Sequence, residues 1–129
     1  MRARHKGRRL WTDRSGASAV EFGLVVPIFV MLVFGAISLA FLAFAASSLN
    51  YAVQDAARCA AVNKTLCPDA ASIEDYARSK YYGPSITAMF TYSTTGCGNT
   101  VSAKGIYSMD LVPQLSKIPL TAQACHPSA

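Results

Sequence analysis

The feature that most constrains this sequence is the long apolar run from Phe22 to Ala46. No Asp, Glu, Lys or Arg occurs between Glu21 and Asp55. As a helix that rises about 1.5 Å per residue, the run would be roughly 37 Å long, which is enough to cross a hydrocarbon core of about 30 Å. We therefore predict a single membrane-spanning helix near the N-terminus, with the span at residues 22–46.

Basic charge is concentrated before this run. Residues 1–16 contain six Arg or Lys and one Asp, which accounts for the whole net charge of +5, whereas residues 17–129 are balanced. Positively charged flanks stay in the cytoplasm, so we expect the N-terminus inside and the C-terminal part outside. A nucleic-acid-binding domain would carry its basic patch on the folded part, so the charge distribution argues against that class.

The acid at the start of the run, Glu21, needs an explanation, because an ionised group near a bilayer is costly unless it is paired. Three interpretations compete. The segment could be a signal anchor in which Glu21 marks the membrane edge, or a secretory signal peptide released after Ala45 in A-F-A. It could also be a prepilin-type signal cut after Gly16, which would place a new ammonium on Ala17, four residues from the carboxylate and its neighbour on a helix. We favour cleavage after Gly16, because it supplies the partner that Glu21 otherwise lacks.

The stretch R-S-G-A-S-A-V-E-F-G-L-V-V-P resembles the start of TadE-like pseudopilins, the minor pilins of tight-adherence (type IVc, Flp-type) pili. The matching features are Gly16, the small residues from Ala17 to Ala19, the pair Glu21-Phe22, and Pro27. The segment N-Y-A-V-Q-D-A-A-R-C-A-A-V, from Asn50 to Val62, is similar to the continuation of the helix in that family. The resemblance covers roughly residues 14–63.

The resemblance implies cleavage between Gly16 and Ala17, with Glu21, Phe22 and Pro27 in the processing and assembly signal. It implies a membrane-inserted subunit that assembles or primes a tight-adherence pilus for surface attachment. Its implied partners are a prepilin peptidase, the major pilin, other minor pilins and the assembly platform, at the bacterial inner membrane or in a surface pilus. The alternative is an unprocessed, single-span protein with an extracytoplasmic binding or sensing domain.

The chain divides into a basic leader (1–16), a transmembrane and stalk helix (17–62) and a small extracytoplasmic domain (63–129). Within the stalk, an apolar stripe and an opposite polar stripe recur at helical spacing. The apolar stripe consists of Leu49, Val53, Ala56 and Ala60, and the polar one of Asn50, Gln54 and Arg58. The apolar stripe could pack on the chain's own domain or on neighbouring subunits.

The extracytoplasmic domain begins with a second helix, capped by Asp69 or by Ser72 in S-I-E-D and ended by Gly83-Pro84. We expect Glu74 and Arg78, four residues apart, to form an ion pair on it. Its core face would hold Ile73, Tyr76, Ala77 and Tyr81.

After this helix the apolar period changes from helical to alternating, which predicts strands at 85–94, 101–109 and 118–125, with a turn at 95–99. Pro119 lacks a backbone donor and indicates an edge strand. The expected fold is therefore α+β and pilin-like: a long N-terminal helix, a short second helix and a small antiparallel sheet of about three strands.

All the cysteines, Cys59, Cys67, Cys97 and Cys125, lie on the side predicted to be extracytoplasmic. An even count in a small exported domain indicates two disulfides, for which three pairings exist. We expect Cys59–Cys67, whose loop is short, together with Cys97–Cys125. A zinc site is the weaker rival, because the sequence has no C-x-x-C and only His5 and His126 as imidazole ligands.

The sequence contains no recognisable catalytic constellation. His126 is the one histidine on the predicted exported side, which is too little for a Cys–His or Ser–His–Asp site. There is no glycine-rich phosphate loop and no cluster of metal ligands. We expect a non-enzymatic protein without a cofactor, a metal or a small-molecule substrate.

Overall fold

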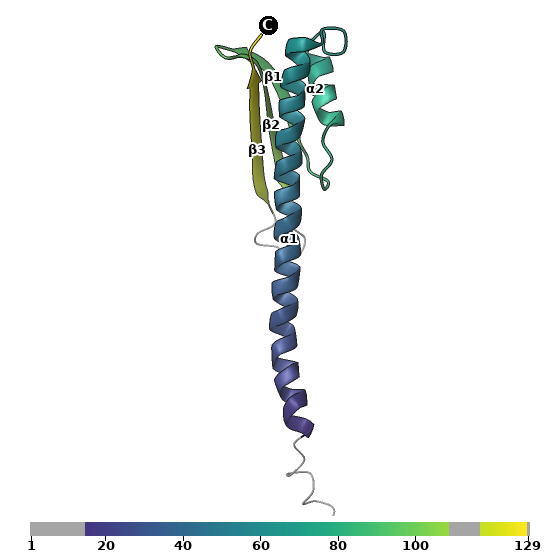
Figure 1. The fold of residues 1–129 in the computed structure, drawn as a ribbon, viewed down its shortest axis with the longest axis vertical. Helices are drawn as coiled ribbons and strands as arrows, with labels where there is room; N and C mark the ends of the chain where they lie inside the picture. Colours follow the sequence, from purple (N-terminus) through teal and green to yellow (C-terminus); the bar gives the residue numbers. More distant parts are fainter. Residues whose placement is uncertain (1–14, 109–116, 129) are drawn as a thin grey trace, which may run out of the picture. The chain divides into compact units, whose positions relative to one another are not determined.

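The computed structural model describes residues 15–108 and 117–128. In chain order its elements are α1 (Ser15–Val62), α2 (Ala70–Ser79), β1 (Met89–Thr95), β2 (Gly98–Tyr107) and β3 (Ile118–His126) (Figure 1). The predicted α+β fold is confirmed, with a long apolar N-terminal helix, a short second helix and a three-stranded antiparallel sheet. The chain divides into two compact units, Met1–Ile37 and Ser38–Ala129. The predicted leader lies almost entirely outside the described residues.

The first unit consists, within the described residues, of the beginning of α1. Nearly all its side chains are exposed, including large apolar ones such as Phe22, which is 72% exposed. Pro27 lies inside the helix. Because proline has no N–H, the carbonyl of Gly23 loses its usual helical hydrogen bond, yet α1 continues without a break.

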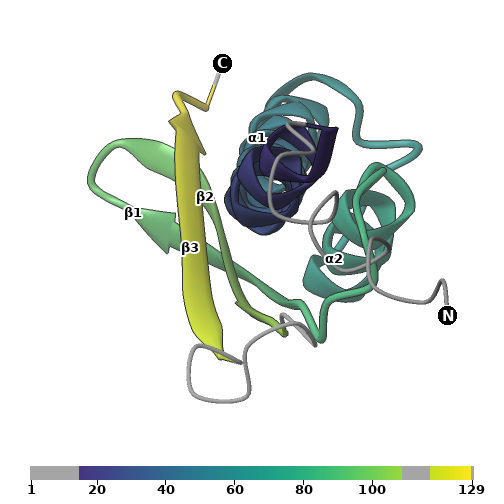
Figure 2. The same ribbon diagram turned by 90° about the horizontal axis from the view of Figure 1, so that it is seen from below.

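The second unit is built around the remaining part of α1. Both helices lie on the same side of the sheet (Figure 2). The predicted apolar stripe from Leu49 to Ala60 is completely buried in the core, and the predicted polar stripe is exposed. The stripe thus packs on the chain's own domain.

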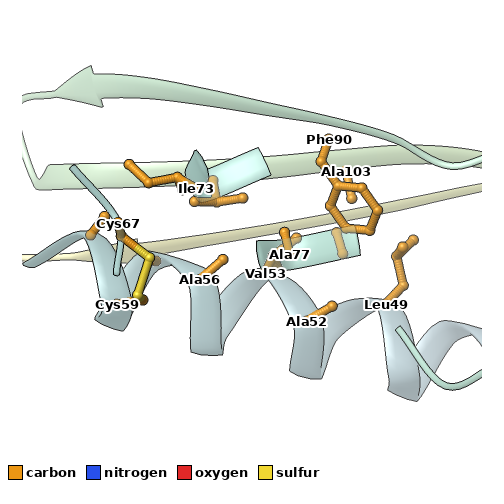
Figure 3. Packing of buried hydrophobic residues seen from close by; sticks show 14 residues of the cluster. Leu49, Ala52, Val53, Ala56, Cys59, Cys67, Ile73, Ala77, Phe90 and Ala103 are labelled. Carbon is orange, nitrogen blue, oxygen red and sulfur yellow. A yellow bond between two sulfur atoms is a disulfide. The ribbon is translucent and has the colours of Figure 1, made fainter. Parts of the chain in front are cut away.

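The core combines many small side chains of α1 with residues of α2 and of the sheet (Figure 3). Phe90 and Ile73 are its large members from the sheet and from α2. α2 and the sheet also contribute the buried residues Ala77, Val101, Ala103 and Ala122.

The sheet has the order β1-β2-β3 with antiparallel neighbours, so Pro119 lies on an edge strand, as predicted. The turn is shorter than expected, because Thr95 pairs directly with Gly98 around a two-residue loop. Gly98 has φ of +131°, and a Cβ there would lie 2.5 Å from the carbonyl oxygen of His126. Only glycine therefore fits this position without strain.

β1 begins four residues later than predicted, at Met89. The backbone N–H of Ala88 donates to the carbonyl of Ile86 at 3.0 Å, which closes a tight turn and interrupts the extended run. Ile86 and Ala88 nevertheless pack against the core, as their alternation indicated. The predicted second strand spans 101–109, whereas β2 begins at Gly98 and ends at Tyr107; Met109 lies outside the described residues.

α2 departs from the prediction at both ends. Its N-cap is Asp69, whose carboxylate accepts the Ser72 N–H at 2.8 Å while the Ser72 hydroxyl accepts the Asp69 N–H at 3.2 Å, so S-I-E-D is not the capping box. The bond from the Ser72 backbone N–H to the carboxylate, followed by an interaction with the Ser72 side chain, lowers the pKa of Asp69 below its ordinary value. The helix ends at Ser79 with Lys80 as C-cap, before Gly83 is reached.

The predicted ion pair between Glu74 and Arg78 is wrong. Arg78 instead pairs with Asp75 at 2.8 Å, on the exposed side of α2. Glu74 turns towards the sheet, where its carboxylate accepts the backbone N–H of Tyr92 at 3.0 Å. A half-buried position beside an edge strand favours this bond over a solvent-exposed pair.

Candidate assembly segment

The residues singled out as a processing and assembly signal all lie near the start of α1. Gly16, Ala17, Glu21, Phe22 and Pro27 are exposed. Within the described part of the chain, a methyl group added to Gly16 would meet no atom within 4 Å beyond its own helical turn. The fold itself therefore does not require glycine at this position.

Ala17 and Glu21 are one helical turn apart on α1, so they share a face of the helix. Among the residues that the structure describes, the ion pairs lie on other side chains, and Glu21 takes no part in them. The arrangement leaves the carboxylate open to a partner placed at or near Ala17.

The apolar part of α1 meets the requirements for crossing a membrane in length and composition, and its most apolar stretch is not buried in the protein. Apolar side chains surround the helix on every side, as in a membrane span and unlike a helix on the surface of a soluble domain. One such helix is consistent with a single-pass membrane protein.

Residues 16–58 match the family model of TadE-like proteins. The TadE-like segment begins at Gly16, ends at Arg58, lies entirely in α1 and makes up about a third of the chain. The resemblance found in the sequence is thereby confirmed for this segment. No curated protein and no solved structure matches the chain.

The TadE-like segment has two structural roles. Its first part presents apolar side chains to the surroundings, whereas its last part supplies Leu49, Val53 and Ala56 to the core of the folded domain. The domain thus depends on this segment for its own core.

Two disulfides fix the end of the domain at which α1 terminates. Cys59–Cys67 joins the last turn of α1 to the loop before α2, with 6.0 Å between the Cα atoms. Cys97–Cys125 joins the β1–β2 hairpin to β3. The expected pairing is confirmed, and because all four cysteines are used, no thiolate remains for the rival zinc site.

A polar cluster between α1 and α2 was not predicted from the sequence. The Asp55 carboxylate accepts the Tyr76 hydroxyl at 3.0 Å and lies 3.6 Å from the ammonium of Lys80, which is 5.0 Å from the centre of the Tyr76 ring. The pKa of Lys80 is raised, first by its side-chain interaction with Tyr76 and also by the charge of Asp55. Asp55 is 21 residues from Tyr76, too far in sequence for local spacing to reveal the cluster, which ties the stalk to α2.

Proposed function

We propose that this protein is a non-enzymatic, membrane-inserted minor pilin or pseudopilin that assembles or primes a tight-adherence (Flp-type) pilus for surface attachment. The observation that supports the proposal most is the TadE-like match, which coincides with an exposed apolar helix that has Gly16 and Glu21 at its start.

The protein is oriented in the bacterial inner membrane with its N-terminus in the cytoplasm and residues 63–129 outside. Two features support this orientation. The excess positive charge precedes the span, as expected for a cytoplasmic flank. The domain after the span holds both disulfides, which persist in oxidising compartments such as the periplasm.

Prepilin peptidase removes the leader after Gly16. The open surroundings of Gly16 support a glycine requirement that comes from the peptidase, because no atom in the described part of the fold excludes a larger side chain there. Cleavage leaves an ammonium on Ala17, which pairs with Glu21 of the same or a neighbouring subunit. The pair lets both groups enter an apolar helix bundle together.

Neighbouring pilins pack against the faces of α1 that the folded domain leaves open. The stripe from Leu49 to Ala60 is already occupied by the chain's own core. The opposite face carries Phe44 and Tyr51, seven residues apart and each about half exposed. Together with the apolar run before it, this face offers the major pilin, other minor pilins and the assembly platform a continuous helical surface.

The mass and N-terminal residue of the mature protein, purified from membranes of a host with a tight-adherence system, test the proposal. A chain that begins at Ala17 is expected. A chain that begins at Met1 would contradict processing and favour the anchored binding or sensing domain, and one that begins at Ala46 would identify a secreted protein. Surface piliation of a strain that lacks the gene, with and without a plasmid copy, then tests the role in assembly.

A further inference from the structure

The apolar run ends inside the folded domain. Ala45 is fully buried and Leu42 and Ala46 are partly buried, although all three belong to the run. On the same turns Phe41 and Phe44 remain about half exposed. One side of the final turns is therefore covered by the domain, and the other is open to the surroundings.

The same end of the domain carries exposed apolar side chains, which we name the rim: Tyr82, Met89, Ile106 and Pro119. Tyr82 is 69%, Met89 71% and Ile106 50% exposed. Ile106 pairs across the sheet with Pro119, and Met89 pairs with Lys104, two residues before Ile106. Met89, Ile106 and Pro119 thus share the sheet face that is turned away from the helices. They lie at the end of the sheet opposite the β1–β2 hairpin (Figure 1).

The rim also has a fixed position along α1. The backbone N–H of Tyr82 donates to the Ser48 hydroxyl at 2.7 Å, and Ser48 follows the apolar run by two residues. An exposed aromatic side chain is thereby held where the run gives way to polar sequence. Tyrosine is enriched at the membrane–water interface in membrane proteins, because its ring is apolar and its hydroxyl is polar.

Three lysine residues lie next to the rim residues in the sheet or along the chain. Lys104 lies between Met89 and Thr121 on the outward face, Lys117 directly precedes β3, and Lys80 is two residues from Tyr82, with Asp55 as its partner. Long basic side chains of this kind lay their methylene groups on apolar surface and reach towards phosphate.

We propose that the rim is a lipid-binding surface that docks on the phospholipid headgroups of the leaflet from which α1 leaves the membrane. The inference rests on the proposed membrane insertion. Tyr82, Met89, Ile106 and Pro119 enter the zone between headgroups and acyl chains, and Lys104 and Lys117 contact lipid phosphates. The rim lies beside the end of the apolar run, where α1 would leave the membrane. For this reason we assign lipid headgroups as its partner.

The test uses the full chain, with Trp11→Phe to remove the native indole, in vesicles of phosphatidylcholine and phosphatidylglycerol that carry a doxyl-labelled lipid. Tryptophan is placed at the rim by Ile106→Trp or, separately, Tyr82→Trp. The matched control is Leu66→Trp, at an exposed apolar residue beside Cys67 at the other end of the domain. Peptide mapping of the two disulfides verifies the fold of each variant.

Both rim variants are expected to emit at shorter wavelength than the control and to lose most of their fluorescence to a doxyl group near the headgroups. Omission of phosphatidylglycerol is expected to weaken this quenching. A chain that resists alkaline extraction but shows no more quenching at the rim than at Leu66→Trp would overturn the rim and leave insertion standing. A chain released by alkali would overturn both. If the tryptophan emission moves to shorter wavelength as the protein-to-lipid ratio rises, but the doxyl lipid does not quench it, the rim binds a neighbouring protein and the lipid proposal is overturned.

Discussion

The carboxylate of Glu74 in α2 accepts a hydrogen bond from the backbone N–H of Tyr92 in β1, at 3.0 Å. β1 is an edge strand, so this N–H would otherwise point away from the sheet without a strand partner. The contact joins the second helix to the sheet and covers one edge of it. It also explains why Glu74 does not take part in the ion pair that its spacing from Arg78 suggests.

Glu74→Ala is expected to destabilise the domain by about 1–3 kcal/mol, because the Tyr92 N–H is left without its acceptor in a partly buried place. The neighbouring acid supplies a control, since the exposed pair of Asp75 with Arg78 is worth about 0–1 kcal/mol. Thermal unfolding in detergent micelles measures both variants. A loss for Glu74→Ala no larger than that for Asp75→Ala would show that the edge contact stabilises the domain no more than an exposed ion pair does.

Glu21→Ala is expected to leave insertion and cleavage intact and to abolish piliation. Removal of the charge makes the span more apolar, but an ammonium on a neighbour's Ala17 then enters the helix bundle unpaired, at a cost of about 3–5 kcal/mol by analogy with soluble proteins. Membrane fractionation, mature mass and surface pili are compared with those of the wild type. Full piliation with the variant as the sole copy would exclude an assembly role for this carboxylate.

Gly16→Ala is expected to keep the leader attached without disturbing the fold. Among the described residues beyond its own helical turn, no atom lies within 4 Å of the added methyl group, so we expect any effect to arise in the peptidase. Intact mass of the membrane-extracted protein reports cleavage, and a thermal melt reports the fold. A mature mass that corresponds to a start at Ala17 in this variant would refute the prepilin interpretation.

The double variant Cys59→Ala, Cys67→Ala is expected to lose about 2–4 kcal/mol of stability, because the end of α1 is no longer tied to the loop before α2. Non-reducing peptide mapping of the wild type should recover Cys59–Cys67 and Cys97–Cys125. Recovery of crossed pairs, or of free thiols, would contradict the structure.

The cap of α2 should weaken in acid. The pKa of Asp69 is lowered in the folded protein, so its contribution is fully present above the unfolded value of about 3.9 and is lost as the pH falls through the lower folded value. Asp69→Asn keeps a cap that does not titrate, and its stability should depend less on pH in this range. Melting temperatures at a series of acidic pH values test this; parallel curves for the two proteins would disprove it.

Local patterns predicted much of the fold. The apolar run predicted α1, alternation predicted three strands, and the spacing of Leu49, Val53 and Ala56 predicted the buried stripe. Local spacing could not reveal the hydrogen bonds between different elements. Examples are Asp55 with Tyr76 and Glu74 with Tyr92, whose members are 21 and 18 residues apart.

The candidate assembly segment was recognisable from Gly16 and Glu21, since both belong to a short motif. Their roles are not visible in the isolated chain, because Gly16 has open surroundings and both residues act on other molecules in the proposed function. The rim could not be predicted either. It combines Tyr82, Met89 and Ile106, which only the sheet register and the Ser48 contact bring to one end.

Because α1 supplies the core with Leu49 and Val53, synthesis and folding cannot proceed in the same order. The helix is made first, yet its buried face is covered by residues as late as Ala122 in β3. If α1 enters the membrane before the rest of the domain is exported, the core around this stripe stays incomplete until β3 has crossed as well. Cys97 must likewise wait for Cys125, so the second disulfide can close only after β3 has reached the same side of the membrane.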